Sequence, residues 1–477
     1  MQLPAEPPRG MVTEGMSQPG GIVAGSDALP DQVSLSSAFR VWCRVAALSF
    51  GGPAGQISVM HRILVEEKKW ISEERFLHAL SYCMLLPGPE AQQLATYTGW
   101  LMHGTRGALM AGILFILPGY VSMMLLSILY AVGQQTFIVS AIFFGLKPAV
   151  LAVVLEAVVR ISRRALKNRV MYGVAAASFL MIFLLKIPFP VIIVSAGLFG
   201  LITERLASHW VVIVPAPKPA ADGSRSETSL PMDRLPQPTL SRAFRISAVC
   251  LTLWFGPLLV VRWLLPGDSV FLQEGLFFSK AAVVTFGGAY AVLGYIAQQA
   301  VDRFGWLQSG EMLDGLGMAE TTPGPLIMVV QFVGFMGAYR HPEGLSPVLA
   351  GFLGATLTTW VTFVPCFYWI FLGAPWIETL RGSRRLNAAL SCITAAVLGV
   401  VVNMSVWFAA HTLFTDVRNV RSGWLHFIEP VWSTFQPAAA GISVVAFLMT
   451  FAFHCRLVVT LAVCCGLGFL IKLAGCG

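Results

Sequence analysis

The sequence predicts an all-α polytopic membrane protein that is built from two homologous halves. Apolar residues make up 56% of its 477 residues and charged residues 12%, about half the share of an ordinary soluble domain. This length accommodates about a dozen apolar spans of about 20 residues each. The sequence Ser49-Phe50-Gly51-Gly52 recurs as Thr285-Phe286-Gly287-Gly288, 236 positions later (51 to 287). A largely apolar chain with such a repeat is typical of a transporter or channel.

A second pair of motifs follows the first at a constant distance. Leu86-Pro87-Gly88-Pro89 belongs to the first half and Thr322-Pro323-Gly324-Pro325 to the second. In each half, 36 positions separate the first glycine from the first proline (51 to 87 and 287 to 323). All four motifs interrupt apolar segments, which predicts helices broken at these points. Gly/Pro breaks at matching positions of two halves indicate the substrate site of a transporter.

The chain divides at changes in composition. Residues 1–35 are rich in Pro, Gly and Ser and are predicted to be a disordered tail. Residues 36–203 form the first repeat, 204–241 a Pro/Ser-rich cytoplasmic linker, 242–266 an unpaired linking helix and 267–477 the second repeat. The apolar segments of the first repeat lie at 38–60, 76–102, 107–131, 136–159, 170–185 and 188–203. Those of the second lie at 271–300, 311–339, 345–373, 388–412, 432–451 and 456–475.

These segments and the linking helix predict about thirteen crossings, six in each half and one between. Basic residues gather in the loops at 160–169 and 381–385, which places both loops and the N-terminus inside. Seven crossings then separate equivalent positions, so the halves are predicted to be inverted repeats. The number of crossings leaves an alternative open. If each Gly-Gly segment enters and leaves the membrane on the same side, an even number of crossings separates equivalent positions, and the halves are parallel.

The broken helices predict a site for a compact oxyanion. A helix that restarts inside the membrane presents free N–H groups and the positive end of its dipole. Glycine lets a ligand approach the backbone, and proline in the first helical turn removes no needed donor. In the alternative interpretation, Gly51-Gly52 and Gly287-Gly288 only let helices pack closely, as small residues do in membranes.

Charged residues inside apolar segments support a functional interpretation, because intramembrane charge is costly. They are Arg44, Glu90, Lys147, Glu156, Lys280 and Glu320. Arg44 and Lys280 occupy equivalent positions before the two Gly-Gly pairs and are predicted to neutralise the substrate. Snorkelling to the interface or structural pairing with carboxylates is the alternative for both, and a structural role is the preferred interpretation of Glu156. Glu320 precedes the hydroxyl groups of Thr321 and Thr322, which favours function.

The motif blocks resemble the chromate ion transporter family, in its long-chain, two-domain form. The blocks are Ser49-Phe50-Gly51-Gly52-Pro53-Ala54-Gly55-Gln56, Leu86-Pro87-Gly88-Pro89-Glu90-Ala91-Gln92-Gln93-Leu94-Ala95 and Glu320-Thr321-Thr322-Pro323-Gly324-Pro325-Leu326. The resemblance covers about residues 38–475 and implies a multi-pass protein of the bacterial cytoplasmic membrane that exports chromate and confers chromate resistance. It implies sulfate as a related substrate. The full candidate site is Arg44, Gly51, Gly52, Gln56, Pro87, Gly88, Pro89, Glu90, Gln92, Lys147, Lys280, Gly287, Gly288, Glu320, Thr321, Thr322, Pro323, Gly324 and Pro325.

Other functional classes find little support in the sequence. The nine cysteines show no C-x-x-C spacing and the eight histidines no paired spacing, so neither a metal nor another cofactor is expected. The net charge of +8 is placed in loops, which indicates topology and not nucleic-acid binding. The chain is predicted not to be an enzyme. An anion channel or a transporter of another oxyanion is the alternative function. Expected partners are chromate or sulfate and the lipid bilayer, with protons as a candidate coupling ion and a homodimer as a candidate assembly.

Overall fold

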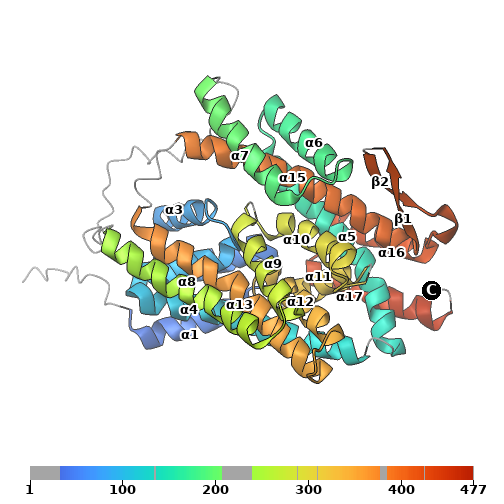
Figure 1. Ribbon diagram of the computed structural model, residues 1–477, viewed down its shortest axis with the longest axis horizontal. Helices are drawn as coiled ribbons and strands as arrows, with labels where there is room; N and C mark the ends of the chain where they lie inside the picture. The colour runs from blue at the N-terminus through green and yellow to red at the C-terminus, as the bar shows by residue number, and fades with distance from the viewer. Residues whose placement is uncertain are drawn as a thin grey trace, which may run out of the picture. The chain divides into compact units, whose positions relative to one another are not determined.

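Helices form wherever the sequence is apolar, because a helix satisfies every backbone hydrogen bond within its own segment. The computed structural model describes residues 33–133, 136–206, 239–286, 288–308, 310–376, 384–423 and 425–475. Most of the predicted tail 1–35, most of the linker 204–241, the loop at 377–383 and Gly287 therefore lie outside the described residues. From Ser34 onward the chain forms one compact unit (Figure 1).

The described residues of the first half form seven α-helices and one π-helix, η1. They are α1 (Leu35–Leu48), α2 (Gly52–His61), η1 (Arg62–Glu67), α3 (Glu73–Cys83), α4 (Glu90–Gly133), α5 (Phe137–Ala165), α6 (Arg169–Phe183) and α7 (Phe189–Leu206). Helix α4 is kinked where His103 and Gly104 leave helical geometry, with Gly104 at φ +59°. Its first part, 90–102, is the end of the predicted segment 76–102, and its second part, 105–133, covers the predicted segment 107–131.

Helix α8 (Leu240–Leu264) follows, and the second half then repeats the order of the first. Its elements are α9 (Val270–Val284), α10 (Ala289–Gln298), η3 (Gln299–Arg303), α11 (Glu311–Thr321), η4 (Leu326–Met328), α12 (Val329–Arg340), α13 (Pro347–Gly373), η5 (Ala374–Trp376), α15 (Arg384–Leu413), α16 (Pro437–Phe447), η7 (Leu448–Ala452) and α17 (Leu457–Leu473). Both second helices, α2 and α10, end in a π-helical turn, η1 and η3. The repeat in sequence is thus a repeat of local structure.

A β-hairpin interrupts the second half between α15 and α16. Strands β1 (Val417–Ser422) and β2 (Leu425–Pro430) pair antiparallel, from Val417 opposite Pro430 to Ser422 opposite Leu425, and a short 3₁₀ turn η6 (Trp432–Thr434) follows. The His426 N–H donates to the Leu184 carbonyl at 2.8 Å, which ties the hairpin to the end of α6. Helices dominate as predicted, and this hairpin is an addition that the sequence analysis did not anticipate.

The last helices of each half pack on the other half. Helices α6 and α7 pack along α15, and α16 and α17 pack along α5; Figure 1 shows α7 and α15 side by side. Small residues permit this contact: a Cβ on Gly145 of α5 would lie 2.0 Å from the Cys464 carbonyl oxygen of α17. Close approach of backbones through glycine is a common way to join helices in membranes. The two halves are therefore interlocked.

Six described helices are long and apolar enough to cross a membrane: α4, α5, α7, α8, α13 and α15. Four shorter apolar helices are Arg169–Phe183, Leu326–Arg340, Pro437–Ala452 and Leu457–Leu473. The helices on either side of the Gly-Gly breaks are short, with 14 residues in α1 and 15 in α9. The predicted breaks at Gly51-Gly52 and at the Pro-Gly-Pro motifs thus separate distinct helices, while the count of thirteen crossings stays a prediction.

Candidate functional site

The four motifs meet through two reciprocal backbone hydrogen bonds. The N–H of Gly88 donates to the Thr285 carbonyl at 2.7 Å, and the N–H of Gly324 donates to the Ser49 carbonyl at 2.9 Å. Each bond joins a Pro-Gly-Pro motif of one half to the Gly-Gly motif of the other. We call the described residues of 49–52, 86–89, 285–288 and 322–325 the motif junction.

Hydroxyl groups at the motif junction donate hydrogen bonds to backbone carbonyls of the helices that precede them. Ser49 Oγ donates to the Val45 carbonyl and Thr285 Oγ1 to the Ala281 carbonyl, each at 2.6 Å. Ser49 is fully buried and Thr285 is 3% exposed. The ends of α1 and α9 are therefore satisfied, both by these hydroxyls and by the opposite glycine N–H groups. Thr321 and Thr322 likewise donate to helix carbonyls, those of Met318 and Ala319.

Helices restart at the motif junction without side-chain caps. Helix α2 begins after Gly51, at φ +80°, and α10 after Gly288, at φ +98°. In the described part of the chain no side chain caps either N-terminus. Helix α4 begins at Glu90, directly after Pro89, and η4 directly after Pro325. Uncapped N-termini carry partial positive charge, which suits an anion.

Buried glutamines brace the breaks. Gln56 Nε2 donates to the Gly324 carbonyl at 2.5 Å and Gln93 Nε2 to the Pro87 carbonyl at 2.8 Å. Gln92 Nε2 donates to Thr96 Oγ1 at 2.9 Å. The three side-chain oxygens are buried and have no hydrogen-bond partner among the described residues. Gln56 and Gln92 were predicted, whereas Gln93, which lies in the same motif block, was not singled out.

Glu320 is buried against a tyrosine that the sequence analysis missed. Tyr290 OH donates to Glu320 Oε1 at 2.5 Å, and Glu320 is 3% exposed. The same hydroxyl is the nearest atom to Gly52, 4.0 Å from where a Cβ would stand. Glu156 and Arg160, an ion pair at 2.5 Å, lie within electrostatic range of Glu320. Only the fold brings Tyr290 of the second half beside Gly52 of the first.

Arg44 and Lys280, the two cations predicted to neutralise the substrate, differ in their surroundings from the buried residues of the motif junction. Arg44 forms an ion pair with Glu67 at 2.6 Å, and its side chain is 49% exposed. Lys280 is exposed and makes no hydrogen bond or ion pair within the described ranges. Glu90 lies within electrostatic range of Arg164 at the basic end of α5. Among the described residues, therefore, no hydrogen bond or ion pair connects Arg44 or Lys280 to the motif junction.

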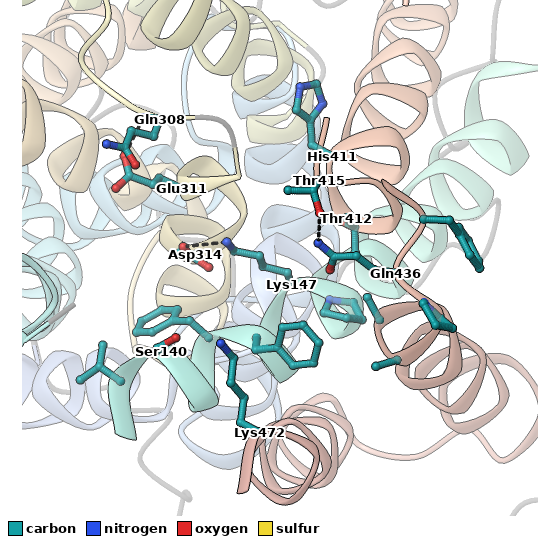
Figure 2. A pocket seen from close by; sticks show the side chains of 18 of the residues that line it. Ser140, Lys147, Gln308, Glu311, Asp314, His411, Thr412, Thr415, Gln436 and Lys472 are labelled. Carbon is teal, nitrogen blue, oxygen red and sulfur yellow. Dashed lines mark hydrogen bonds and ion pairs between the residues drawn. The ribbon is translucent and has the colours of Figure 1, made fainter. Parts of the chain in front are cut away.

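Lys147 lies in a different place, a cavity of about 650 Å³ that we call the α5–α11 pocket (Figure 2). It is lined by Tyr130, Val139, Ser140, Phe143, Phe144, Lys147, Pro148, Gln308, Glu311, Asp314, His411, Thr412, Thr415, Phe435, Gln436, Pro437, Ala438, Ala439 and Lys472. Lys147 Nζ is 3.5 Å from Asp314 Oδ2, and Tyr130 OH donates to the same oxygen at 2.9 Å.

A second ion pair holds the start of α11. Arg340 makes two hydrogen bonds with Glu311, at 2.7 Å and 2.8 Å, and donates to the Trp306 carbonyl at 2.7 Å. The Gln308 N–H also donates to Glu311, at 2.7 Å. Glu311, Asp314 and Arg340 were not among the predicted site residues, although all three lie in the apolar segment 311–339 or directly after it. Applying the cost of intramembrane charge to every ionisable residue of that segment would have found them.

Comparison with known proteins places the chain among transporters. The family model described as chromate transporter matches residues 36–201 and 272–469. A chromate transport protein of Pseudomonas aeruginosa is 30% identical over 384 residues, which cover 79% of this chain and 82% of that protein. A chromate transport protein of Cupriavidus metallidurans is 26% identical over 409 residues, covering 83% and 88% respectively. A probable chromate transport protein of Synechococcus elongatus is 25% identical, covering 80% and 86%. No solved structure matches the chain.

Proposed function

We propose that this chain, which belongs to the chromate transporter family, exports chromate across the bacterial cytoplasmic membrane as a secondary transporter and thereby confers chromate resistance. Its apolar helices and its family make it a multi-pass membrane protein. With the cell interior negative, outward movement of a dianion is downhill by about 4–5 kcal/mol per 100 mV. Export therefore needs no coupling ion in principle, and sulfate is a second substrate to test.

An inverted relationship between the halves is supported by the contact between α4 and α13. Gly112 of α4 packs against the Phe367 ring of α13. Further along α4, Tyr120 bonds Thr356, which comes earlier in α13, so the two helices run antiparallel. Tyr120 and Thr356 are separated by the repeat offset of 236 residues. Equivalent residues that touch on antiparallel helices indicate a two-fold axis perpendicular to both, as in an inverted repeat.

We further propose that each half contains four full crossings and two broken segments that enter and leave on the same side. At 1.5 Å per residue, the 14-residue helix α1 is about 21 Å long, short of a hydrocarbon core of about 30 Å. With α8 as the link, four, one and four crossings make nine in place of thirteen, and the halves are still inverted. This topology also puts the basic residues of the 61–75 loop inside.

The substrate site is proposed at the motif junction. The observation that carries this proposal is the reciprocal pair of hydrogen bonds, Gly88 to Thr285 and Gly324 to Ser49. These bonds satisfy the carbonyls that end α1 and α9 and leave the uncapped N-termini of α2 and α10 nearby. The partial positive charge of these helix N-termini favours an oxyanion. The four motifs with Gln56, Gln92, Glu90 and Glu320 form the proposed site.

Inverted membrane vesicles that contain the protein test this function. Chromate should accumulate inside them when the lumen is made positive, and vesicles without the protein supply the background. Preloading the vesicles with unlabelled chromate should accelerate entry of labelled chromate, because an alternating carrier exchanges substrate faster than it returns empty. A channel would show uptake without this acceleration. Uptake at background level under every imposed gradient would reject chromate transport altogether.

A further inference from the structure

We propose that the α5–α11 pocket is a second oxyanion site, at which Lys147 leaves Asp314 to bind the departing oxyanion while Asp314 takes up a proton. This inference rests on the proposed export function and adds to it a second site and a proton bound together with the oxyanion. The pocket is lined by the start of α5, the end of α15, the start of α16 and the end of α17. In the proposed topology all four of these helix ends lie at the outer face, so the pocket is on the exit path.

Lys147 is free to change partners. Its ammonium group lies 3.5 Å from Asp314, and its side chain is 32% exposed, at the pocket wall. The neighbouring pair of Arg340 and Glu311 is held by two short hydrogen bonds, and the Arg340 side chain is less exposed than that of Lys147, at 20%. A lysine is a compact charge on a flexible stem, whereas the arginine fork is fixed by its geometry. Of the two ion pairs on α11, the Lys147 pair is therefore the one that an incoming anion can open.

Once Lys147 moves away, the buried Asp314 carboxylate has lost its counter-ion, and its negative charge has to be compensated in another way. Its side chain is 3% exposed, and its Oδ1 is buried without a hydrogen-bond partner among the described residues. The groups that face it are Lys147 from α5, Tyr130 from α4 and Glu311 from its own helix, with Arg340 of α12 behind Glu311. Arg340 is already neutralised by Glu311, so it does not replace Lys147. A buried carboxylate without a counter-ion is costly, and uptake of a proton removes its charge.

A second cation lines the pocket from another helix. Lys472 of α17 has its Nζ 5.7 Å from the centre of the Phe144 ring and forms no ion pair with a described residue. Figure 2 shows both lysines among the lining residues: Lys147, on α5 together with Ser140, points toward Asp314, and Lys472 comes from α17. Two ammonium groups and a hydroxyl suit a tetrahedral dianion, which accepts hydrogen bonds in several directions.

The exchange is balanced in charge and protons. Before it, Lys147 and Asp314 form a neutral pair, and a dianion and one proton are in solution. Afterwards the Lys147–dianion pair carries one negative charge and Asp314 is a neutral acid. No covalent bond changes apart from the O–H bond formed on Asp314. When the anion leaves outward, Lys147 returns to Asp314 and the proton is released.

Calorimetric titration of the purified full-length protein measures this proton. Sulfate and chromate are titrated separately at alkaline pH, where both are dianions, in buffers that differ in ionisation enthalpy. Wild-type protein should take up about one proton per bound oxyanion. Asp314→Asn should bind the anion at least as tightly and take up none, because Lys147 is then free. Lys147→Gln should bind about tenfold more weakly or worse, and Lys147→Arg should recover part of the loss.

Glu66→Gln is the matched control, since Glu66 is an exposed carboxylate whose one ion pair in the described part of the chain is with His61; it should retain wild-type proton uptake. Anion binding without proton uptake in the wild type would overturn this inference and leave the proposed export intact, and so would unchanged uptake in Asp314→Asn. Failure of the wild type to bind either anion would contradict the proposed function itself. If Asp314→Asn does not fold, Lys147→Gln gives the same decision.

Discussion

Tyr120 and Thr356 are hydrogen-bonded to each other at 2.7 Å and are equivalent positions of the two halves. The two halves therefore contact each other through residues that occupy the same position in the repeat. Close by, Gly119 packs against the Pro323 carbonyl and the Gly324 backbone, so the same part of α4 touches the Pro-Gly-Pro motif of the second half. The symmetry contact and the motif junction thus belong to one region of the molecule, where a small change can affect both halves.

The topology predicts that Lys69 is cytoplasmic. In a cysteine-free background, a single cysteine at Lys69 should react with an impermeant thiol reagent only in inverted vesicles. The reason is that the 61–75 loop carries Arg62, Lys68, Lys69 and Arg75, which the cytoplasmic side retains. A cysteine at Gly344, in the described loop between α12 and α13, should react only from outside. Labelling of the Lys69 position in intact cells would support thirteen crossings and contradict nine.

Alanine at Gly88 or Gly324 should abolish most transport. Gly88 has φ +128° and Gly324 φ +104°, which disfavour any residue with a Cβ. A Cβ on Gly88 would also lie 2.9 Å from Cys366 Sγ. The strain amounts to about 1–3 kcal/mol and falls on the hydrogen bonds that join the halves. Vesicle uptake of chromate at matched expression measures the effect.

Gly173→Ala provides the control for both alanine variants. Gly173 lies within α6 with no positive φ and no atom within 4 Å of a built Cβ. Its alanine variant should transport normally. Wild-type uptake in Gly88→Ala and Gly324→Ala would mean that the junction geometry is not needed for transport.

Tyr290→Phe should impair transport because it leaves the buried Glu320 carboxyl without its hydrogen bond. The loss of such a bond costs about 1–3 kcal/mol, which thermal unfolding in detergent measures alongside uptake. Tyr295→Phe is the matched change on the same helix. Tyr295 is 6% exposed, and its hydroxyl makes no hydrogen bond with a described residue. Equal effects of the two variants would show that the Tyr290–Glu320 contact has no special role.

Arg44→Gln and Lys280→Gln test the sequence-based hypothesis that these two cations neutralise the substrate: on that hypothesis both variants reduce chromate transport while changing thermal stability little. The Arg44–Glu67 pair is half exposed, and such pairs contribute about 0–1 kcal/mol. Arg44→Lys should also impair transport, because lysine cannot make two parallel bonds to an oxyanion, while Lys280→Arg should be milder.

Glu67→Gln separates the two interpretations of Arg44. It removes the ion-pair partner but keeps the arginine charge, so transport should persist if that charge serves the substrate. Normal uptake in both Arg44→Gln and Lys280→Gln at matched expression would instead assign the two residues to anchoring helix ends.

Local features of the fold followed from the sequence alone. The segment predicted at 136–159 is α5, Phe137–Ala165, and the linking helix predicted at 242–266 is α8, Leu240–Leu264. The helix breaks at Gly51 and at Pro87 to Pro89 lie where the motifs placed them. These features depend on hydropathy and on the backbone preferences of glycine and proline, which are properties of a few consecutive residues.

Contacts between distant residues were decided by the tertiary structure. No local pattern pairs Gly88 with Thr285, Tyr290 with Glu320 or Lys147 with Asp314. Arg44 illustrates the difference: the sequence identified a charge in an apolar segment, but only the fold placed Glu67 beside it. The sequence by itself therefore determined where helices form, where they break and that the pattern occurs twice. Which side chains meet at those breaks depends on how the two halves interlock, because hydrogen bonds and ion pairs act over a few ångströms in space and not along the chain.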